Sequence, residues 1–215
     1  MNHGNSPAYP PGIEACGRGV HNSLMAENPV TVQSLVLAGG ESRRMGIDKA
    51  LISYHGEPQV RRLAAMMESV AGPAYVSVRR TQLNDAVFLG LRLVCDQVEN
   101  IGPLAGLLAA FAHAPDCAWL VAAVDLPWIS AGTLQRLLSA RDPACFATAY
   151  RIPHTDRPEP VCAIYEPAIL PALQRARDRK RYSLMLLRDV PLKLLDPADE
   201  RELQGVNEPG EFGGE

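Results

Sequence analysis

Short apolar runs alternate with amphipathic segments along the chain after residue 31. The apolar runs predict strands at Val32–Leu37, Tyr75–Val78, Leu91–Cys95, Ala118–Val124, Cys145–Tyr150, Val161–Tyr165 and Leu192–Leu195. Helical spacing of apolar residues predicts helices at Pro58–Val70, Pro103–His113, Ala131–Ser139, Pro167–Arg177 and Ser183–Arg188. This alternation predicts an α/β fold of three layers, with a mostly parallel sheet and helices on both faces.

Residues 1–30 do not continue this pattern. They are rich in Pro, Gly and Asn, and no basic segment followed by an apolar core marks them as a signal peptide. We therefore expect a flexible N-terminal extension over 1–30 and a single domain over 31–215.

Composition narrows the classes of function. The chain has 215 residues, of which 47% are hydrophobic and 21% charged, and a net charge of −3. This balance gives no broad basic surface for nucleic acid, and no apolar run is long enough to span a membrane. The five cysteines are widely spaced, which argues against a zinc site or a redox pair. Four of them, Cys95, Cys117, Cys145 and Cys162, lie in apolar runs and are expected to be buried thiols, which indicates a cytoplasmic protein.

The first strand leads into a glycine-containing loop with three cations. Ala38, Gly39 and Gly40 remove side-chain bulk where the strand ends, so the backbone N–H groups can approach phosphate oxygens. Arg43, Arg44 and Lys49 follow, a spacing that suits a polyphosphate. The loop matches neither Walker A nor the dinucleotide fingerprint. An ordinary strand-to-turn connection is the alternative interpretation.

Two acids end predicted strands at the same edge of the sheet. Asp96 follows Leu91–Cys95, and Asp125 follows Ala118–Val124. Each alone is consistent with a plain turn. Together at one edge they predict a Mg²⁺ site, because Mg²⁺ is usually shared between one or two carboxylates and substrate phosphates.

The glycine loop resembles the signature of the molybdenum-cofactor guanylyltransferases, which are nucleotidyltransferases with a Rossmann-like fold. The family pattern is Leu-Ala-Gly-Gly-x-Ser-x-Arg-Met-Gly-x-Asp-Lys. It is matched here by Leu37, Ala38, Gly39, Gly40, Ser42, Arg44, Met45, Gly46, Asp48 and Lys49. A later Asp-x-Pro begins at Asp125, and Asp96 precedes a Gly-Pro-Leu-Ala-Gly segment over residues 102–106, as in the family.

The resemblance implies the roles of these residues. Nucleotide contacts are expected from Leu37, Ala38, Gly39, Gly40, Lys49, Asp96 and Asp125. Arg44, Lys49 and Asp125 are the expected catalytic residues, with Asp125 holding the Mg²⁺ cofactor. The implied reaction transfers GMP from GTP to the phosphate of molybdenum-molybdopterin and releases pyrophosphate. Proteins of molybdoenzyme maturation are the macromolecular partners that it suggests.

Other reactions remain open. They are cytidylyl transfer to the same cofactor, nucleotidyl transfer to a sugar phosphate, and GTP binding without turnover. The chain departs from the family at Ser77, where an asparagine is common, and keeps only Asn207 of a C-terminal Asn-x-Asn-Thr-Pro motif.

Two further segments have two interpretations each. Residues 157–160, Arg-Pro-Glu-Pro, are either a stiff loop or part of an acceptor pocket, and the basic residues over 175–181 are either a solvated helix end or a phosphate-attracting patch.

Overall fold

The computed structural model describes residues 30–39, 49–98 and 100–206 and contains a seven-stranded sheet of order β3-β2-β1-β4-β6-β5-β7. The strands are β1 (Val32–Leu37), β2 (Ala74–Val78), β3 (Arg92–Cys95), β4 (Ala118–Ala123), β5 (Ala147–Arg151), β6 (Pro158–Tyr165) and β7 (Leu192–Leu195). Among these described strands only β6 runs antiparallel to its neighbours, β4 and β5. The mostly parallel sheet is therefore confirmed.

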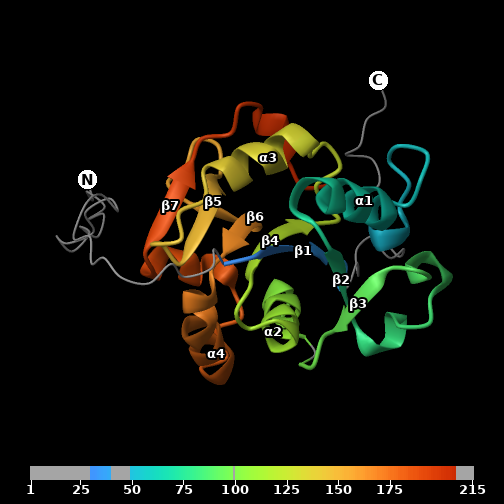
Figure 1. Cartoon of the computed structure of the whole chain (residues 1–215), viewed down its shortest axis with the longest axis horizontal. Coiled ribbons are helices and arrows are strands. Elements are labelled where there is room, and N and C mark those ends of the chain that lie inside the picture. Colours follow the sequence, from blue (N-terminus) through green and yellow to red (C-terminus); the bar gives the residue numbers. More distant parts are fainter. Residues whose placement is uncertain (1–29, 40–48, 99, 207–215) are drawn as a thin grey trace, which may run out of the picture.

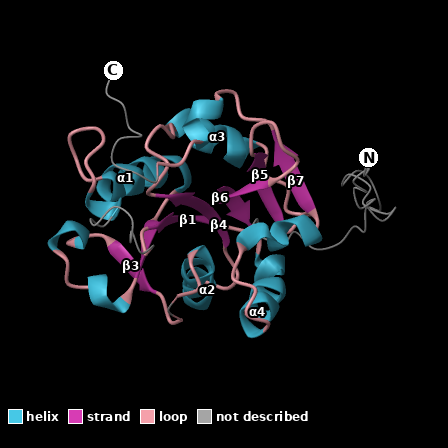
Figure 2. Ribbon diagram, turned by 180° about the vertical axis from the view of Figure 1, so that it is seen from behind, coloured by secondary structure: helices cyan, strands magenta, loops and turns pink. Residues whose placement is uncertain are grey.

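Four α-helices cover the two faces of the described sheet. They are α1 (Gln59–Ala71), α2 (Pro103–His113), α3 (Ala131–Ser139) and α4 (Leu170–Asp178). Figures 1 and 2 show α1 and α3 on one face and α2 and α4 on the other. The predicted three-layer arrangement is thus confirmed. Short 3₁₀ helices lie at Lys49–Leu51, Arg80–Gln82, Ala86–Phe88, Pro167–Ile169, Leu184–Asp189 and Glu200–Leu203.

Local sequence signals fix several helix ends. α2 begins with Pro103 in its first turn, and α3 is capped by Ser130, whose Oγ accepts from the backbone N–H of Thr133. Both helices have the predicted bounds. Ser183 also acts as a cap, with its Oγ accepting from the N–H of Met185, but the segment after it is 3₁₀ rather than α-helical.

Two other segments differ from the sequence expectations. The predicted helix at Pro167 begins as a 3₁₀ turn and becomes α-helical at Leu170. β6 begins at Pro158, so most of the segment 157–160 is strand rather than loop. β6 pairs with β5 through Pro158 but with β4 only as far as Cys162. A proline lacks the N–H that a central strand needs, and Pro160 lies beyond the β4 pairing, where that loss is tolerated.

The core has two parts because side chains alternate across each strand. On β4, Leu120 and Ala122 face the α1 and α3 side, whereas Trp119 and Val121 face the α2 and α4 side. Every residue of β4 is buried. A strand buried on both faces reads as a continuous apolar run, which is why β4 is so clear in the sequence.

The strand order creates a crevice beside β1. The chain adds β2 and β3 on one side of β1 and then places β4 on the other side. Connections after β1 and β4 therefore leave in opposite directions, which opens a ligand crevice at the carboxyl ends of these strands.

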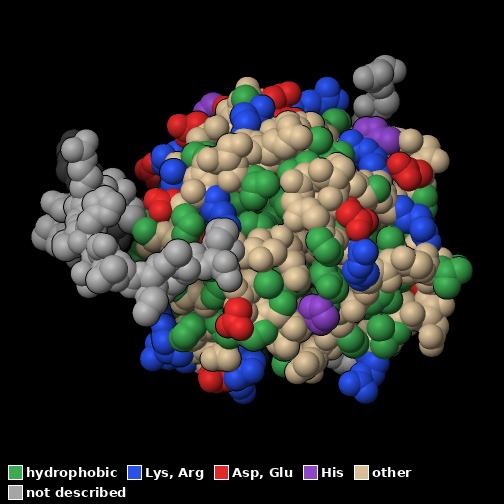
Figure 3. All heavy atoms as spheres, in the orientation of Figure 1, with side chains coloured by type: hydrophobic (Ala, Val, Ile, Leu, Met, Phe, Trp, Pro, Cys, Tyr) green, Lys and Arg blue, Asp and Glu red, His purple; other side chains and the backbone are tan. Residues whose placement is uncertain are grey.

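On the face of the described part that is seen in Figure 3, Lys and Arg side chains do not form one basic patch. There the Lys and Arg side chains are scattered, mostly toward the margin. None of the described helices combines the length and the apolar character needed to cross a bilayer.

A buried ion pair after α3 predicts a large effect on stability. The Arg141 Nε lies 2.6 Å from Glu166 Oε1, and these side chains are only 14% and 3% exposed. Arg141→Gln leaves the Glu166 carboxylate buried without its charge partner, so the free energy of unfolding should fall by about 3–5 kcal/mol. Urea denaturation measures this loss.

A matched exposed pair provides the control. The Arg92 Nη1 lies 2.7 Å from Glu68 Oε1, but these side chains are 51% and 50% exposed. Arg92→Gln should change the free energy of unfolding by no more than about 1 kcal/mol. Equal losses in the two variants would contradict the special role of the buried pair.

Candidate active site

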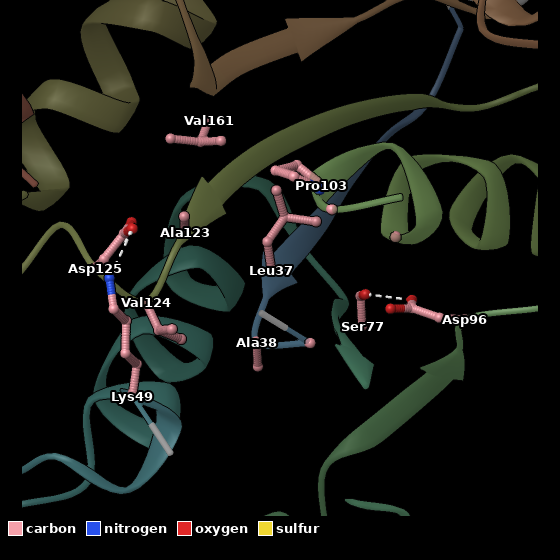
Figure 4. Close-up of a pocket in the computed structure, with 13 residues that line it drawn as sticks. Leu37, Ala38, Lys49, Ser77, Asp96, Pro103, Ala123, Val124, Asp125 and Val161 are labelled. Carbon is pink, nitrogen blue, oxygen red and sulfur yellow. Dashed lines mark hydrogen bonds and ion pairs between the residues drawn. The ribbon is translucent and has the colours of Figure 1, made fainter. Parts of the chain in front are cut away.

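The ends of β1 and β4 form one pocket. The N–H of Val124 donates to the carbonyl of Leu37 at 3.2 Å, so the two strand ends stay side by side. The pocket encloses about 150 Å³ and is lined by Leu37, Ala38, Gly39, Lys49, Ser77, Asp96, Gly102, Pro103, Gly106, Ala123, Val124, Asp125 and Val161. Figure 4 shows the acids Asp125 and Asp96 on opposite sides of the β1 end.

The structure thus places six of the expected site residues around this pocket. They are Leu37, Ala38, Gly39, Lys49, Asp96 and Asp125. Gly40 and Arg44 lie outside the described residues, as does Asn207. Their proposed roles stay predictions. The basic segment 175–181 contributes no residue to the described lining of the pocket.

A side chain at Gly39 would crowd a neighbouring carboxylate. A Cβ at Gly39 would lie 2.6 Å from Asp96 Oδ2, a distance that forces something to shift. The sequence suggested that glycine makes room for a ligand. The structure adds a second reason, because the backbone already passes against Asp96. Gly106 is similar, since its Cβ would lie 2.5 Å from Ser77 Oγ and 2.6 Å from Leu37 Cδ2.

Asp96 is held by Ser77 on the adjacent strand β2. The Ser77 hydroxyl donates to Asp96 Oδ1 at 2.7 Å, and Ser77 is only 1% exposed. Burial raises the pKa of Asp96 to about 6, although the Ser77 hydrogen bond and the charge of Arg79 both oppose the rise. Sequence reasoning noted Ser77 only as a departure from asparagine and gave it no role. Its hydrogen-bonding partner became visible only in the fold.

Lys49 and Asp125 meet across the β1–β4 crevice. Lys49 Nζ lies 3.5 Å from Asp125 Oδ2 and also donates to the carbonyl of Val206 at 3.1 Å. The N–H of Val206 donates in turn to the backbone carbonyl of Asp125 at 2.8 Å. Lys49 therefore neutralises a carboxylate that is 76 residues away in sequence and is held there by the C-terminal segment.

Comparison with known proteins assigns the family. A family model described as "MobA-like NTP transferase domain" matches residues 34–192, which is most of the chain and includes the pocket. The chain belongs to this family. Its membership agrees with the expectation from the glycine loop, and it makes the protein a nucleotidyltransferase by family.

Two curated relatives illustrate the range of this MobA-like family. The "Probable molybdenum cofactor guanylyltransferase" of Opitutus terrae is 34% identical over 189 residues, covering 82% of this chain and 90% of the relative. The "Molybdenum cofactor biosynthesis bifunctional protein" of Synechocystis sp. is 29% identical over 180 residues, covering 83% of this chain. The chain spans only 52% of the length of that second relative.

Solved structures share the fold. Molybdopterin-guanine dinucleotide biosynthesis protein A from Archaeoglobus fulgidus has a TM-score of 0.70 at 19% identity, over 84% of this chain and 94% of that one. A Mycobacterium tuberculosis protein solved as a complex with manganese has a TM-score of 0.55 at 16% identity, over 78% and 89% of the two chains. These likenesses confirm the Rossmann-like nucleotidyltransferase fold of the MobA-like chain.

The donor groups at Asp125 fit a divalent cation. Asp125 Oδ1 is buried and has no hydrogen-bond partner among the described residues, so it retains its capacity to accept. The described part of the chain holds no cluster of three or more His, Cys, Asp or Glu that would ligate a metal without other ligands. One carboxylate completed by substrate phosphates and water is the usual arrangement for Mg²⁺.

Glu159 is a further acid that sequence reasoning left without a role. Burial raises its pKa to about 7, a bond from the Val161 N–H opposes the rise, and the nearby charge of Asp125 adds to it. The signal available in the sequence was a carboxylate between two prolines just before an apolar run. Its partial burial depends on the unexpected extension of β6.

The raised pKa of Asp96 predicts a pH-dependent stability. Below the ordinary value of 3.8 the carboxyl is protonated in both folded and unfolded chains, and its contribution is fully present. As pH rises from 3.8 to about 6, the unfolded chain releases its proton more readily and stability is lost. Asp96→Asn keeps an acceptor for Ser77 but removes the ionisation.

Calorimetry in EDTA checks this prediction. The Tm of Asp96→Asn minus that of wild type should increase between pH 4 and about 6 and level off above it. The ionisation of Glu159 changes the Tm of both proteins alike, so it cancels in the difference. Asp116→Asn, at an exposed position outside the pocket, controls for the loss of one negative charge. A flat difference for Asp96→Asn would mean that Asp96 ionises equally easily in both states.

Proposed function

We propose that this chain transfers GMP from GTP to the terminal phosphate of molybdopterin carrying molybdenum. An oxygen of the acceptor phosphate attacks the α-phosphorus of GTP, the bond between the α-phosphorus and the bridging oxygen breaks, and pyrophosphate leaves. The observation that carries the proposal is the juxtaposition of Lys49 with Asp125 at the carboxyl ends of β1 and β4. Family membership supplies the reaction class.

The pocket residues suit a reaction that depends on charge neutralisation. The attacking phosphate is already an anion, so neither a side-chain nucleophile nor a strong general base is required. Lys49 supplies positive charge toward the triphosphate and the leaving pyrophosphate. Leu37, Ala38 and Gly39 bring backbone groups to the nucleotide, and Gly40 and Arg44 keep their predicted roles in phosphate binding.

A divalent cation, Mg²⁺ in our proposal, fits beside Asp125. The unpartnered Asp125 Oδ1 would hold it, and the ion would supply charge neutralisation for the phosphates. In the structure Lys49 balances part of the Asp125 charge. Lys49 also lines the pocket, where its ammonium would face the phosphate oxygens of a bound nucleotide.

Guanine and molybdopterin are proposed from the names of relatives. The Opitutus terrae relative is named a guanylyltransferase of the molybdenum cofactor, and this chain covers 90% of it. Cytidylyl transfer, a sugar-phosphate acceptor and binding without turnover are the competing outcomes. A cytoplasmic setting and contacts with molybdoenzyme maturation proteins stay predictions.

Pyrophosphate release distinguishes these outcomes. Each of the four nucleoside triphosphates is incubated with the chain and Mg²⁺ in three conditions: with molybdenum-molybdopterin, with a sugar phosphate, and with no acceptor. GTP binding is measured in parallel by calorimetry. We expect release only with GTP and the acceptor together. Release with CTP would move the chain to cytidylyl transfer, release with a sugar phosphate would replace the acceptor, and GTP binding without any release would contradict catalysis.

Substitution of Asp125 tests the metal role. Asp125→Asn keeps the shape of the side chain but removes the charge that attracts the cation. Turnover at fixed Mg²⁺ should fall at least about tenfold, equal to about 1.4 kcal/mol of activation free energy. A near-unchanged Mg²⁺-dependent rate, in a variant with a wild-type Tm, would remove Asp125 from this role.

Competition between nucleotides tests base preference. Phosphate and metal groups do not distinguish bases, so preference has to come from hydrogen bonds to the base edge, where a wrong base leaves polar groups unpaired. We predict that GTP binds more tightly than CTP by at least about tenfold, or about 1.4 kcal/mol. A calorimetric competition titration in Mg²⁺ measures the ratio. Tighter binding of CTP would contradict the guanylyl assignment while leaving the reaction class unchanged.

A further inference from the structure

The loop that follows Asp125 is held by side chains from the segment between Lys49 and the middle of α1. The Gln59 Nε2 donates to the carbonyl of Leu126 at 3.2 Å, and Gln59 is fully buried. The His55 Nε2 lies 2.8 Å from the carbonyl of Pro127. Both contacts end on the two residues that come directly after Asp125.

Arg62 completes this set of contacts from the next turn of α1. Its guanidinium donates from Nη1 to the carbonyl of Pro127 and from Nη2 to the carbonyl of Ile129, each at 3.4 Å. Residues three apart lie on the same face of a helix, so Gln59 and Arg62 reach one loop together. We name His55, Gln59 and Arg62 the α1 clamp.

The α1 clamp joins the segment that carries Lys49 to the loop that carries Asp125. The N–H of Ile52 donates to the carbonyl of Lys49 at 3.2 Å, and the N–H of Gln59 donates to the carbonyl of Ile52 at 2.9 Å. The side chain of Gln59 then reaches Leu126. These three hydrogen bonds connect the backbone of Lys49, through Ile52 and Gln59, to the backbone of Leu126, which follows Asp125.

We propose that the α1 clamp positions Asp125 relative to Lys49 and thereby sets the affinity of the pocket for a divalent cation. This inference rests on the metal role of Asp125 in the proposed function. Mg²⁺ requires near-ideal geometry around it, and groups that orient a ligand typically change metal affinity 10–100-fold when they are removed. Without the clamp, the Asp125 loop shifts and Lys49 competes more effectively with the cation for the carboxylate.

Adjacent arginines on α1 give a matched pair of variants. Arg62 donates to the Asp125 loop, whereas Arg61 donates from Nη2 to the carbonyl of Leu89 at 2.7 Å, on a loop that does not line the pocket. Arg62→Gln and Arg61→Gln each remove one guanidinium from the same helix turn. Gln59→Leu removes the buried donor to Leu126, and Arg62→Lys retains positive charge and a single donor group.

The test titrates the full chain with Mn²⁺ and follows binding by electron paramagnetic resonance. Arg62→Gln and Gln59→Leu should bind Mn²⁺ about tenfold more weakly than wild type, and Arg62→Lys should fall between. Arg61→Gln should bind as wild type does. In pyrophosphate-release assays, Arg62→Gln should need more Mg²⁺ for half-maximal rate while kcat at saturating Mg²⁺ stays close to that of wild type.

The outcomes separate this inference from the proposed function. Wild-type binding of Mn²⁺ that Asp125→Asn does not weaken would overturn both, because the cation would lie elsewhere. If Asp125→Asn weakens Mn²⁺ binding but Arg62→Gln and Arg61→Gln both leave it unchanged, only the role of the α1 clamp is overturned. Equal Tm values for the two arginine variants, with Mn²⁺ affinity lost in one alone, would support a positioning role over a merely structural one.

Discussion

The parallel pairing of β1 with β4 is the interaction on which the pocket depends. The register continues from Val32 opposite Ala118 to Leu37 opposite Ala123, so both strands end at the same level of the sheet. The chain then turns away from β1 through Gly39 and from β4 through Asp125. A shift by one residue would exchange the buried faces of β4 and move Asp125 to the other side of the sheet. The register of β4 against β1 therefore determines where the acid lies.

On the β2 side of the pocket, the backbone at two glycines packs closely against polar side chains. Gly39 and Gly106 bring backbone against Asp96 and Ser77, where any Cβ would require a shift. This packing removes water from Asp96 and raises its pKa to about 6. Glu159, on the other side of β4, is half-buried, and its pKa is raised to about 7. A cation placed beside either carboxyl group would favour its charged form.

Asp125 itself is held from two directions. The α1 clamp holds the residues that follow it, and Val206 bonds to its backbone carbonyl. The C-terminal segment is anchored in turn by Glu202, which accepts from Thr133 on α3 and pairs with Arg136 at 3.2 Å. Helices on the α1 and α3 face thus support the carboxyl end of β4. The opposite face contributes α2, whose Gly106 admits the side chains of Leu37 and Ser77.

The sequence by itself determined the elements whose signals are local. The bounds of β1, β7, α2 and α3 follow from apolar periodicity, from Pro103 in a first turn and from the Ser130 cap. The glycine loop and the acids after β3 and β4 also pointed to one edge of a parallel sheet. These features depend on neighbouring residues, so they can be read along the chain.

Only the tertiary structure decided which distant groups meet. The antiparallel direction of β6, the bond from Ser77 to Asp96, the pairing of Lys49 with Asp125 and the α1 clamp each join segments well separated in sequence. The raised pKa values of Asp96 and Glu159 also arise from burial that no local pattern contains. The physical reason is that strand order, register and helix packing fix these distances together, and each depends on the whole core rather than on any one segment.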